Sequence, residues 1–131
     1  MHGSPRILVV EDEPFIAQVL SDVLAAEGYT VDTASNGRLA LEMIEARAYD
    51  LILTDLQMPE LDGIGLCREL EGRRPELLRR LIIISGTIEH PDYEQSLAHI
   101  DVPVLEKPFS LSALHAVMQQ VLAGHESGRP G

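Results

Sequence analysis

Short apolar segments alternate along the chain with longer stretches in which apolar residues recur every three or four positions. The segments at 6–10 (RILVV), 51–54 (LILT) and 81–85 (LIIIS) are continuously apolar, which is typical of parallel strands buried on both faces. The segment at 29–33 (YTVDT) alternates, and the segment at 102–106 (VPVLE) contains Pro103. We therefore expect five strands, with 29–33 and 102–106 at the edges of the sheet.

The stretches between these strands carry helical patterns with recognisable ends. Pro14 suits a first helical turn, and Asn36 and Ser110 suit the start of a helix. Gly28 and Pro75 follow such patterns and are typical of helix ends. The apolar residues at helical spacing are Phe15, Ile16, Val19, Leu20, Val23 and Leu24; Leu39, Leu41, Met43 and Ile44; Ile64, Leu66, Cys67 and Leu70; a weaker stretch after Pro91; and Leu111, Leu114, Val117, Met118, Val121 and Leu122.

Five strands and five helices in strict alternation predict an α/β fold in which a parallel sheet lies between two layers of helices. The crossovers should be right-handed. The length of 131 residues fits one domain, which we place at 6–123. We expect residues 1–5 to be disordered and residues 124–131 to form a flexible tail.

Composition narrows the range of partners. The formal net charge is −11, which argues against binding to the phosphate backbone of nucleic acids and against anionic membrane surfaces. Cys67 is the only cysteine, so no disulfide can form within the chain. The N-terminus has no apolar signal region, and we expect a cytoplasmic protein without membrane insertion. The basic stretch at 73–80 (RRPELLRR) is expected to be a solvated loop rather than a docking site.

Polar residues stand where the predicted strands end. Glu11 and Asp12 follow the first strand, Asp55 the third and Lys107 the fifth, while Ser85 ends the fourth. In an open parallel sheet, ligand sites form beyond the carboxyl ends of the strands. We therefore expect three carboxylates, a hydroxyl and an ammonium group to meet at one edge of the sheet.

Three neighbouring carboxylates point to a bound cation. Two like charges about 4 Å apart repel each other by roughly 4 kcal/mol at an effective dielectric constant of about 20. A divalent cation relieves this repulsion, and a few oxygen ligands with open positions suit Mg²⁺, with Mn²⁺ as an alternative. Lys107 and Ser85 could contact a phosphoryl oxygen. This set of groups fits a carboxylate that forms an aspartyl phosphate.

Four motifs, VVEDEP, LTDLQMPELDG, IIISGT and LEKPF, occur in this order at the predicted strand ends. Together they resemble the receiver domain of response regulators in two-component signal transduction, of the chemotaxis-regulator type, over about residues 6–122. The resemblance implies a flavodoxin-like (βα)5 three-layer sandwich with strand order 2-1-3-4-5. It implies a sensor histidine kinase or a histidine phosphotransfer protein as the phosphoryl donor.

The resemblance also implies a role for each site residue. Asp55 would accept the phosphoryl group, while Asp12, Asp55 and the backbone carbonyl of Gln57 would bind Mg²⁺. Glu11 would help through a water molecule. Lys107 would contact the phosphoryl group, Ser85 would move toward it, and Pro108 would follow a cis peptide bond.

The chain departs from this family at its switch positions. Val104 stands where the family often has an aromatic residue that moves with the hydroxyl, and Gly86 follows Ser85 in place of the usual alanine. We therefore expect the signal to be carried by rearrangement of residues 86–101. Gln57 and Thr87 lie at positions that adjust the lifetime of the phosphate.

Other functions remain open at this point. One is a Mg²⁺-dependent phosphohydrolase with an aspartyl nucleophile, which usually has a second acid where this chain has Gln57. A binding module that has lost phosphorylation is a third class, against which the intact Asp12, Asp55 and Lys107 argue.

The chain could be a stand-alone regulator or the receiver piece of a hybrid histidine kinase in a phosphorelay. It would catalyse only its own phosphorylation and dephosphorylation. Its downstream partner is unknown. A homodimer could use the surface of the fourth helix, fifth strand and fifth helix, or the face of the first helix.

Overall fold

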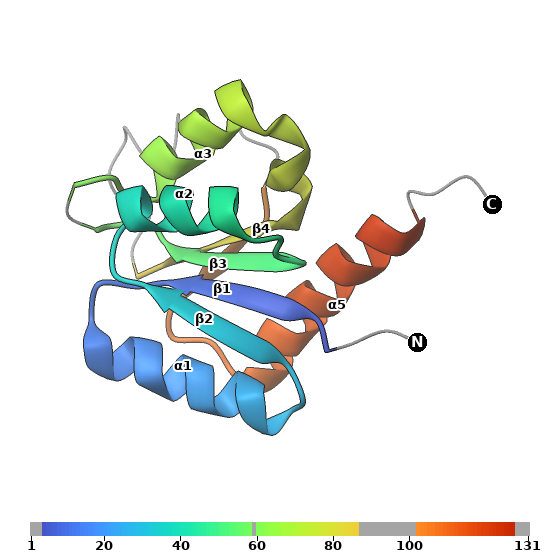
Figure 1. The fold of residues 1–131 in the computed structure, drawn as a ribbon. Helices are drawn as coiled ribbons and strands as arrows, with labels where there is room; N and C mark the ends of the chain where they lie inside the picture. Colours follow the sequence, from blue (N-terminus) through green and yellow to red (C-terminus); the bar gives the residue numbers. More distant parts are fainter. Residues whose placement is uncertain (1–3, 59, 87–101, 128–131) are drawn as a thin grey trace.

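A computed structural model describes residues 4–58, 60–86 and 102–127 of the chain. Its centre is one parallel sheet of five strands in the order β2-β1-β3-β4-β5 (Figure 1), which confirms the predicted sheet. The strands are β1 (Arg6–Val10), β2 (Thr30–Ala34), β3 (Leu51–Asp55), β4 (Leu81–Ser85) and β5 (Val104–Glu106).

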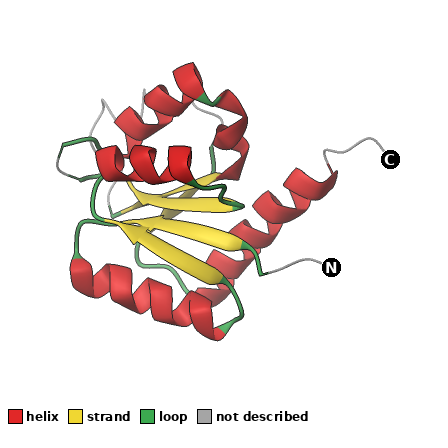
Figure 2. Ribbon diagram, viewed as in Figure 1, coloured by secondary structure: helices red, strands yellow, loops and turns green. Residues whose placement is uncertain are grey.

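Helices cover both faces of this sheet (Figure 2). One apolar cluster joins one face of the sheet to α1 (Pro14–Ala26) and α5 (Leu111–Ser127). The other cluster joins the opposite face to α2 (Gly37–Ala46) and α3 (Gly63–Arg73). A short 3-10 helix, η1 (Pro75–Arg80), leads into β4. The predicted three-layer arrangement is therefore confirmed.

The central strands form the most deeply buried part of the core. All five residues of β4 are buried, and β1 and β3 are buried over four positions each. Apolar side chains on both faces are removed from water, which contributes about 25 cal/mol for each Å² of buried apolar surface. These strands hold their carboxyl ends in fixed positions relative to one another.

Side-chain caps begin three of the helices. Leu39, Gly65 and Ala113 donate their backbone N–H groups to the side chains of residues three positions earlier, at 2.8, 2.8 and 3.0 Å. The accepting caps are Asn36, Asp62 and Ser110. Such caps satisfy backbone donors that have no partner inside the helix and stabilise each helix by about 1 kcal/mol. The caps predicted at Asn36 and Ser110 are confirmed.

Some predicted boundaries were wrong. The last strand begins at Val104 rather than at 102, because Pro103 has no N–H group; its carbonyl instead accepts from the backbone N–H of Ile83 at 2.9 Å. Helix α5 continues to Ser127, so residues 124–127 are helical where a tail was expected. Residues 75–80 form η1 rather than a loop, because Leu77 packs into the core. The domain limits at 6 and 123 stay predictions.

The apolar spacing in α1 predicted a wider buried face than the structure shows. Phe15 is 77% exposed and Val19 is 44% exposed, although both fit the apolar spacing. Ala17 and Leu24 are the buried residues of this helix. Phe15 and Val19 lie four positions apart and therefore share a side of the helix that faces water.

Some expectations concern residues that the structure does not describe: the helix after Pro91, the rearrangement of 86–101 beyond Gly86, and the conformation of residues 1–3 and 128–131. Among the helices that the structure describes, none is both long and apolar enough to cross a membrane.

Candidate functional site

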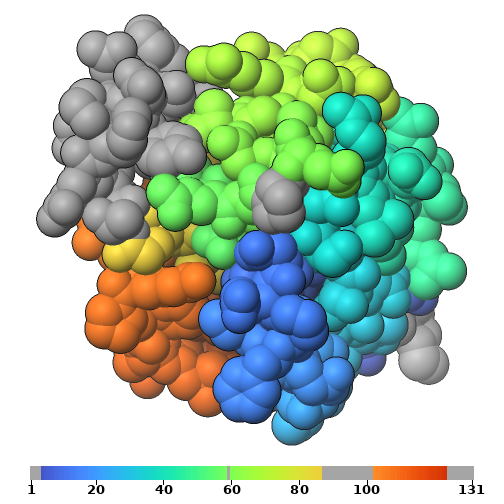
Figure 3. Space-filling view, turned by 90° about the vertical axis from the view of Figure 1, so that its left-hand side faces the viewer, coloured from blue at the N-terminus to red at the C-terminus, as the bar shows by residue number. Residues whose placement is uncertain are grey.

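The carboxyl ends of four strands meet at one edge of the sheet. Figure 3 shows this face, where the chain at the carboxyl ends of β1 (blue), β3 (green), β4 (yellow) and β5 (orange) comes together. Asp55 and Ser85 are the last residues of β3 and β4, while Glu11, Asp12 and Lys107 directly follow β1 and β5. The sheet thus gathers groups that are spread over almost the whole sequence.

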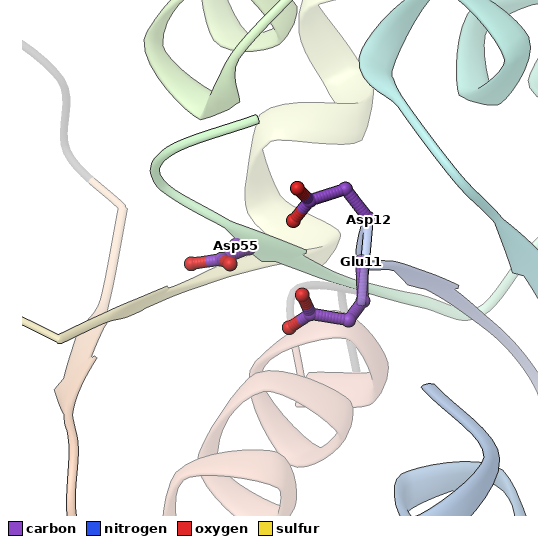
Figure 4. A group of neighbouring side chains, drawn as sticks. All are labelled: Glu11, Asp12 and Asp55. Atoms are coloured by element: carbon purple, nitrogen blue, oxygen red, sulfur yellow. The ribbon is translucent and has the colours of Figure 1, made fainter. Parts of the chain in front are cut away.

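Three carboxylates form the centre of the site. Ligand oxygens of Glu11, Asp12 and Asp55 lie within 4.8 Å of one another, and Figure 4 shows the three side chains around one space. The side chain of Glu11 is 3% exposed and that of Asp55 is 13% exposed. The predicted convergence of these acids is therefore observed.

Lys107 balances part of this negative charge. Its Nζ lies 3.8 Å from Oε1 of Glu11 and 3.8 Å from Oδ2 of Asp55. Both distances are long for a hydrogen bond but close enough for an electrostatic attraction. One ammonium group therefore faces two of the three acids, and its side chain remains 31% exposed.

The surroundings of Glu11 and Asp55 favour the protonated form of each acid. Burial is the main cause that raises the pKa of Glu11 from 4.5 to about 7; the backbone N–H of Glu13 opposes this rise and the charge of Asp55 adds to it. Burial also raises the pKa of Asp55, while Lys107 lowers it. The folded chain therefore resists full ionisation of this group of acids.

The donor set fits a hard divalent cation. Three carboxylates offer only oxygen ligands, and two of them have a raised pKa because their charge is poorly solvated. Mg²⁺ prefers a few carboxylate oxygens and keeps water in its other positions. A cation bound here would stabilise the charged form of each acid.

Ser85 and Lys107 are tied together at the ends of β4 and β5. Ser85 is 1% exposed, and its backbone carbonyl accepts from the N–H of Lys107 at 2.7 Å. The peptide bond between Lys107 and Pro108 is cis, as the resemblance implied. These contacts set where the chain of Lys107 leaves the sheet.

Close backbone packing positions Asp55. The N–H of Leu56 donates to the carbonyl of Ile84 at 2.9 Å, and the N–H of Gly63 donates to the carbonyl of Leu56 at 2.9 Å. A Cβ atom on Gly63 would lie 2.7 Å from the backbone oxygen of Asp55, which is too close for any other residue without a shift. The glycine of the Asp62-Gly63 pair is therefore required by the approach of α3 to the end of β3.

The loop between Asp55 and Gly63 also contacts the start of α2. The N–H of Gly37 donates to the carbonyl of Leu61 at 3.0 Å, and a Cβ atom on Gly37 would lie 2.4 Å from that oxygen. Glu60 has a φ of 67°, a conformation that is uncommon outside glycine. The sequence carried no signal that linked Gly37 to the acceptor loop, since the two positions lie far apart along the chain.

The expected switch and lifetime residues are placed only in part. Gln57 is exposed beyond the end of β3, and Val104 is partly buried against the core cluster beneath α2 and α3. Thr87 lies outside the described residues. Gln57 therefore lies in the loop that follows Asp55, and the roles of these positions stay predictions.

An open groove of about 260 Å³ lies beside the acids, between α1 and the end of β2. Its lining includes Glu11, Asp12, Gln18, Thr33 and Ser35. The sequence did not indicate this groove, because its lining combines residues of α1 with residues at the end of β2, which lie apart along the chain. The exposed Phe15 lies on the same helix.

The chain is similar in sequence to one known protein family and to proteins of two bacteria. The model of the family "Response regulator receiver domain" matches residues 7–119. The chain is 37% identical over 116 residues to the aerobic respiration control sensor protein ArcB of Escherichia coli (strain K12), covering 88% of this chain and 15% of ArcB. It is 34% identical over 125 residues to the alkaline phosphatase synthesis transcriptional regulatory protein PhoP of Bacillus subtilis (strain 168), covering 95% of this chain and 51% of PhoP.

A solved structure shows the same fold. The receiver domain of the sensor histidine kinase PA1611 from Pseudomonas aeruginosa PAO1, which has a magnesium ion coordinated in its active-site cleft, superimposes with a TM-score of 0.82 and 29% identity. The match covers 92% of this chain and 99% of that chain. The present chain thus spans a small part of one curated relative and about half of the other.

Proposed function

The chain belongs to the response regulator receiver domain family, and on that premise we propose that it accepts a phosphoryl group from a phosphohistidine onto Asp55 in a Mg²⁺-dependent reaction. The observation that carries this proposal is the position of Asp55 at the end of β3, among two further acids and with Nζ of Lys107 3.8 Å from its Oδ2. The chain would then change conformation and signal to a partner.

The chemistry is a transfer between two nucleophiles. An Oδ of Asp55 forms a bond to phosphorus while the bond from phosphorus to the donor's imidazole nitrogen breaks, and that nitrogen keeps the electron pair. Lys107 faces Oδ2 of Asp55, so its ammonium group can donate to a phosphoryl oxygen held there. The hydroxyl of Ser85, from the neighbouring strand, is the second donor that we assign to that group.

We assign the metal to Asp12, Asp55 and the backbone carbonyl of Gln57, with Glu11 acting through a water molecule. When bound, Mg²⁺ would neutralise charge on the transferred group, and Mn²⁺ could replace it. Glu11 accepts from the backbone N–H of Glu13 at 3.1 Å, which leaves its other oxygen facing Lys107. This geometry supports an indirect role for Glu11.

The donor that we propose is a sensor histidine kinase or a histidine phosphotransfer protein. Two exposed apolar residues on one side of α1, Phe15 and Val19, support docking of a protein on this helix, because aromatic residues are enriched in protein interfaces. In ArcB and PA1611 the matching domain belongs to a sensor protein, and in PhoP it is about half of a transcriptional regulator. These relatives support a receiver piece of a larger protein, such as a hybrid histidine kinase in a phosphorelay, and a stand-alone regulator is the alternative.

We further propose that the protein acts in the cytoplasm and contacts nucleic acid only through other proteins, in keeping with its net charge of −11. A homodimer could form through α5 and β5 together with the segment between β4 and β5, or through α1. The protein would not turn over an external substrate. A phosphohydrolase is disfavoured because Gln57, two residues beyond the acceptor, cannot donate and accept protons as an acid does.

Labelling with acetyl phosphate tests the function without a cognate kinase. The intact chain should gain one phosphoryl group in the presence of Mg²⁺, and it should gain none when EDTA removes the metal. Asp55→Asn should abolish labelling, whereas Asp50→Asn, the same change just before β3, should retain it. Labelling that persists in Asp55→Asn would place the acceptor elsewhere.

A further inference from the structure

Leu61 lies between two glycines that belong to different helices. A Cβ atom on Gly37, the first residue of α2, would lie 3.0 Å from the Cβ atom of Leu61. A Cβ atom on Gly65, in the first turn of α3, would lie 2.6 Å from Cδ1 of Leu61. Leu61 therefore occupies the space that a side chain at either position would need.

Leu61 is held at the two helices by different contacts. At α2, its backbone carbonyl accepts from the N–H of Gly37 at 3.0 Å, and this N–H is one of the backbone donors that find no partner within the helix. At α3, its partly buried side chain lies against Gly65 and packs on the core cluster beneath α2 and α3. A hydrogen bond and apolar packing together fix the chain at this point.

Gln57 stands in the loop whose far end is Leu61. The start of this loop is fixed at Leu56, whose N–H donates to a backbone carbonyl of β4 and whose carbonyl accepts from the N–H of Gly63, both at 2.9 Å. Glu60, directly before Leu61, has a φ of 67°, and a residue other than glycine keeps this conformation only where surrounding contacts hold the chain. The conformation of the loop thus depends on anchors at both of its ends.

We propose that Leu61 is a positioning residue for the metal site: it holds the loop so that the backbone carbonyl of Gln57 stays available to the cation. This inference rests on the proposed function, which assigns that carbonyl to Mg²⁺. Mg²⁺ demands near-octahedral geometry, so a ligand on a loop serves only when other residues fix its position, and removing such support typically weakens metal binding about 10- to 100-fold. A purely structural Leu61 would instead contribute to the stability of the fold and leave the metal affinity unchanged.

The Mg²⁺ affinity of folded variants separates these two roles. Leu61→Ala removes the side chain that lies against Gly65 but keeps the backbone carbonyl that bonds to Gly37. We expect Mg²⁺ to bind this variant at least about tenfold more weakly than the original chain. The measurement is isothermal titration calorimetry with MgCl₂ at about pH 8, where the acids bind metal in their deprotonated form, and urea unfolding gives the stability of each variant.

Leu78→Ala is the matched control. Leu78 is also a partly buried leucine that packs on the same core cluster, but it belongs to η1 and not to the loop. This variant should lose stability and keep its Mg²⁺ affinity within about twofold. The proposal is overturned if Leu61→Ala keeps the affinity of the original chain, or if the two variants lose the same affinity.

Gly65→Ala tests the same contact from the side of α3, and it decides the question alone if Leu61→Ala does not fold. The new Cβ would displace the side chain of Leu61, so this variant should also bind Mg²⁺ more weakly. Because the two residues share one space, the loss of affinity in the double variant should be smaller than the product of the two single losses. Independent losses, or an unchanged affinity in Gly65→Ala, would contradict the proposal.

The original chain distinguishes a failure of this inference from a failure of the proposed function. An original chain that binds no Mg²⁺ would refute the proposed function, and this inference with it. An original chain that binds Mg²⁺ and takes up a phosphoryl group on Asp55, with an equal Mg²⁺ affinity in Leu61→Ala, would refute this inference alone.

Discussion

Glu11 should destabilise the metal-free folded chain when it ionises. Its pKa is raised from 4.5 to about 7, chiefly by burial. Such a difference in pKa corresponds to about 3 kcal/mol, because a tenfold change in proton affinity is worth about 1.4 kcal/mol. The folded state binds the proton more tightly than the unfolded state, so the contribution to stability is full below about pH 4.5 and is lost as the pH rises through about 7. Burial of Asp55 acts in the same direction.

Replacing Glu11 by glutamine keeps the shape of the side chain and removes its charge. Without metal, we expect Glu11→Gln to raise the free energy of unfolding by up to about 3 kcal/mol at about pH 8 and to leave it almost unchanged at about pH 4.5. Mg²⁺ should stabilise the original chain more than the variant, because bound metal adds to the stability of the folded state. The measurement is urea unfolding at both pH values, with and without Mg²⁺.

The neighbour Glu13 provides a control, since it is exposed and two residues away. Glu13→Gln should show no comparable dependence on pH. The account of a buried carboxylate that is costly to ionise would be refuted in either of two cases. One is a Glu11→Gln variant less stable than the original chain at about pH 8; the other is a difference in stability that is the same at both pH values.

Three further predictions concern other parts of the site. Gly63→Ala should lower the free energy of unfolding, measured in urea, by more than about 2 kcal/mol, because the new Cβ meets backbone atoms. Gly72→Ala is the control and should be neutral or stabilising, because Gly72 has open space around it. Equal effects of the two substitutions would contradict the packing argument. Lys107→Met should slow acetyl phosphate labelling by at least about tenfold through loss of its hydrogen bond to the phosphoryl group, and an unchanged rate would remove its role. Gln57→Ala and Thr87→Ala should change the dephosphorylation rate, followed by intact mass over time, more than the labelling rate; a lifetime insensitive to both would count against them.

The strands and the site followed from the sequence because both depend on simple rules. Continuous apolar runs are typical of strands buried on two faces, and ligand groups collect at the carboxyl ends of parallel strands. Glu11, Asp12, Asp55 and Lys107 lie where these rules put them. No rule of sequence spacing, however, indicated that Lys107 would lie as close to Glu11 as to Asp55.

Features that depend on tertiary packing were missed. The helical spacing of α1 includes Phe15 and Val19, but the sheet and α5 cannot cover the whole apolar circumference of the helix. Pro75 is typical of a helix end, so the sequence did not predict the 3-10 helix that begins there. Leu77 of this helix packs into the core. Arg73 pairs with Glu45, and Arg80 donates to the backbone carbonyl of Tyr49. These contacts join separate segments, so the sequence alone indicated only a basic, solvated stretch at 73–80.

The central claim, that Asp55 is the phosphoryl acceptor, is tested most directly by locating the phosphoryl group on the chain. After reaction with a phosphohistidine donor or acetyl phosphate and Mg²⁺, borohydride reduction converts an aspartyl phosphate to homoserine, which peptide mass spectrometry can locate. The account predicts homoserine at position 55 and at no other aspartate. Homoserine at position 12, or a phosphorylated serine at position 85, would contradict it.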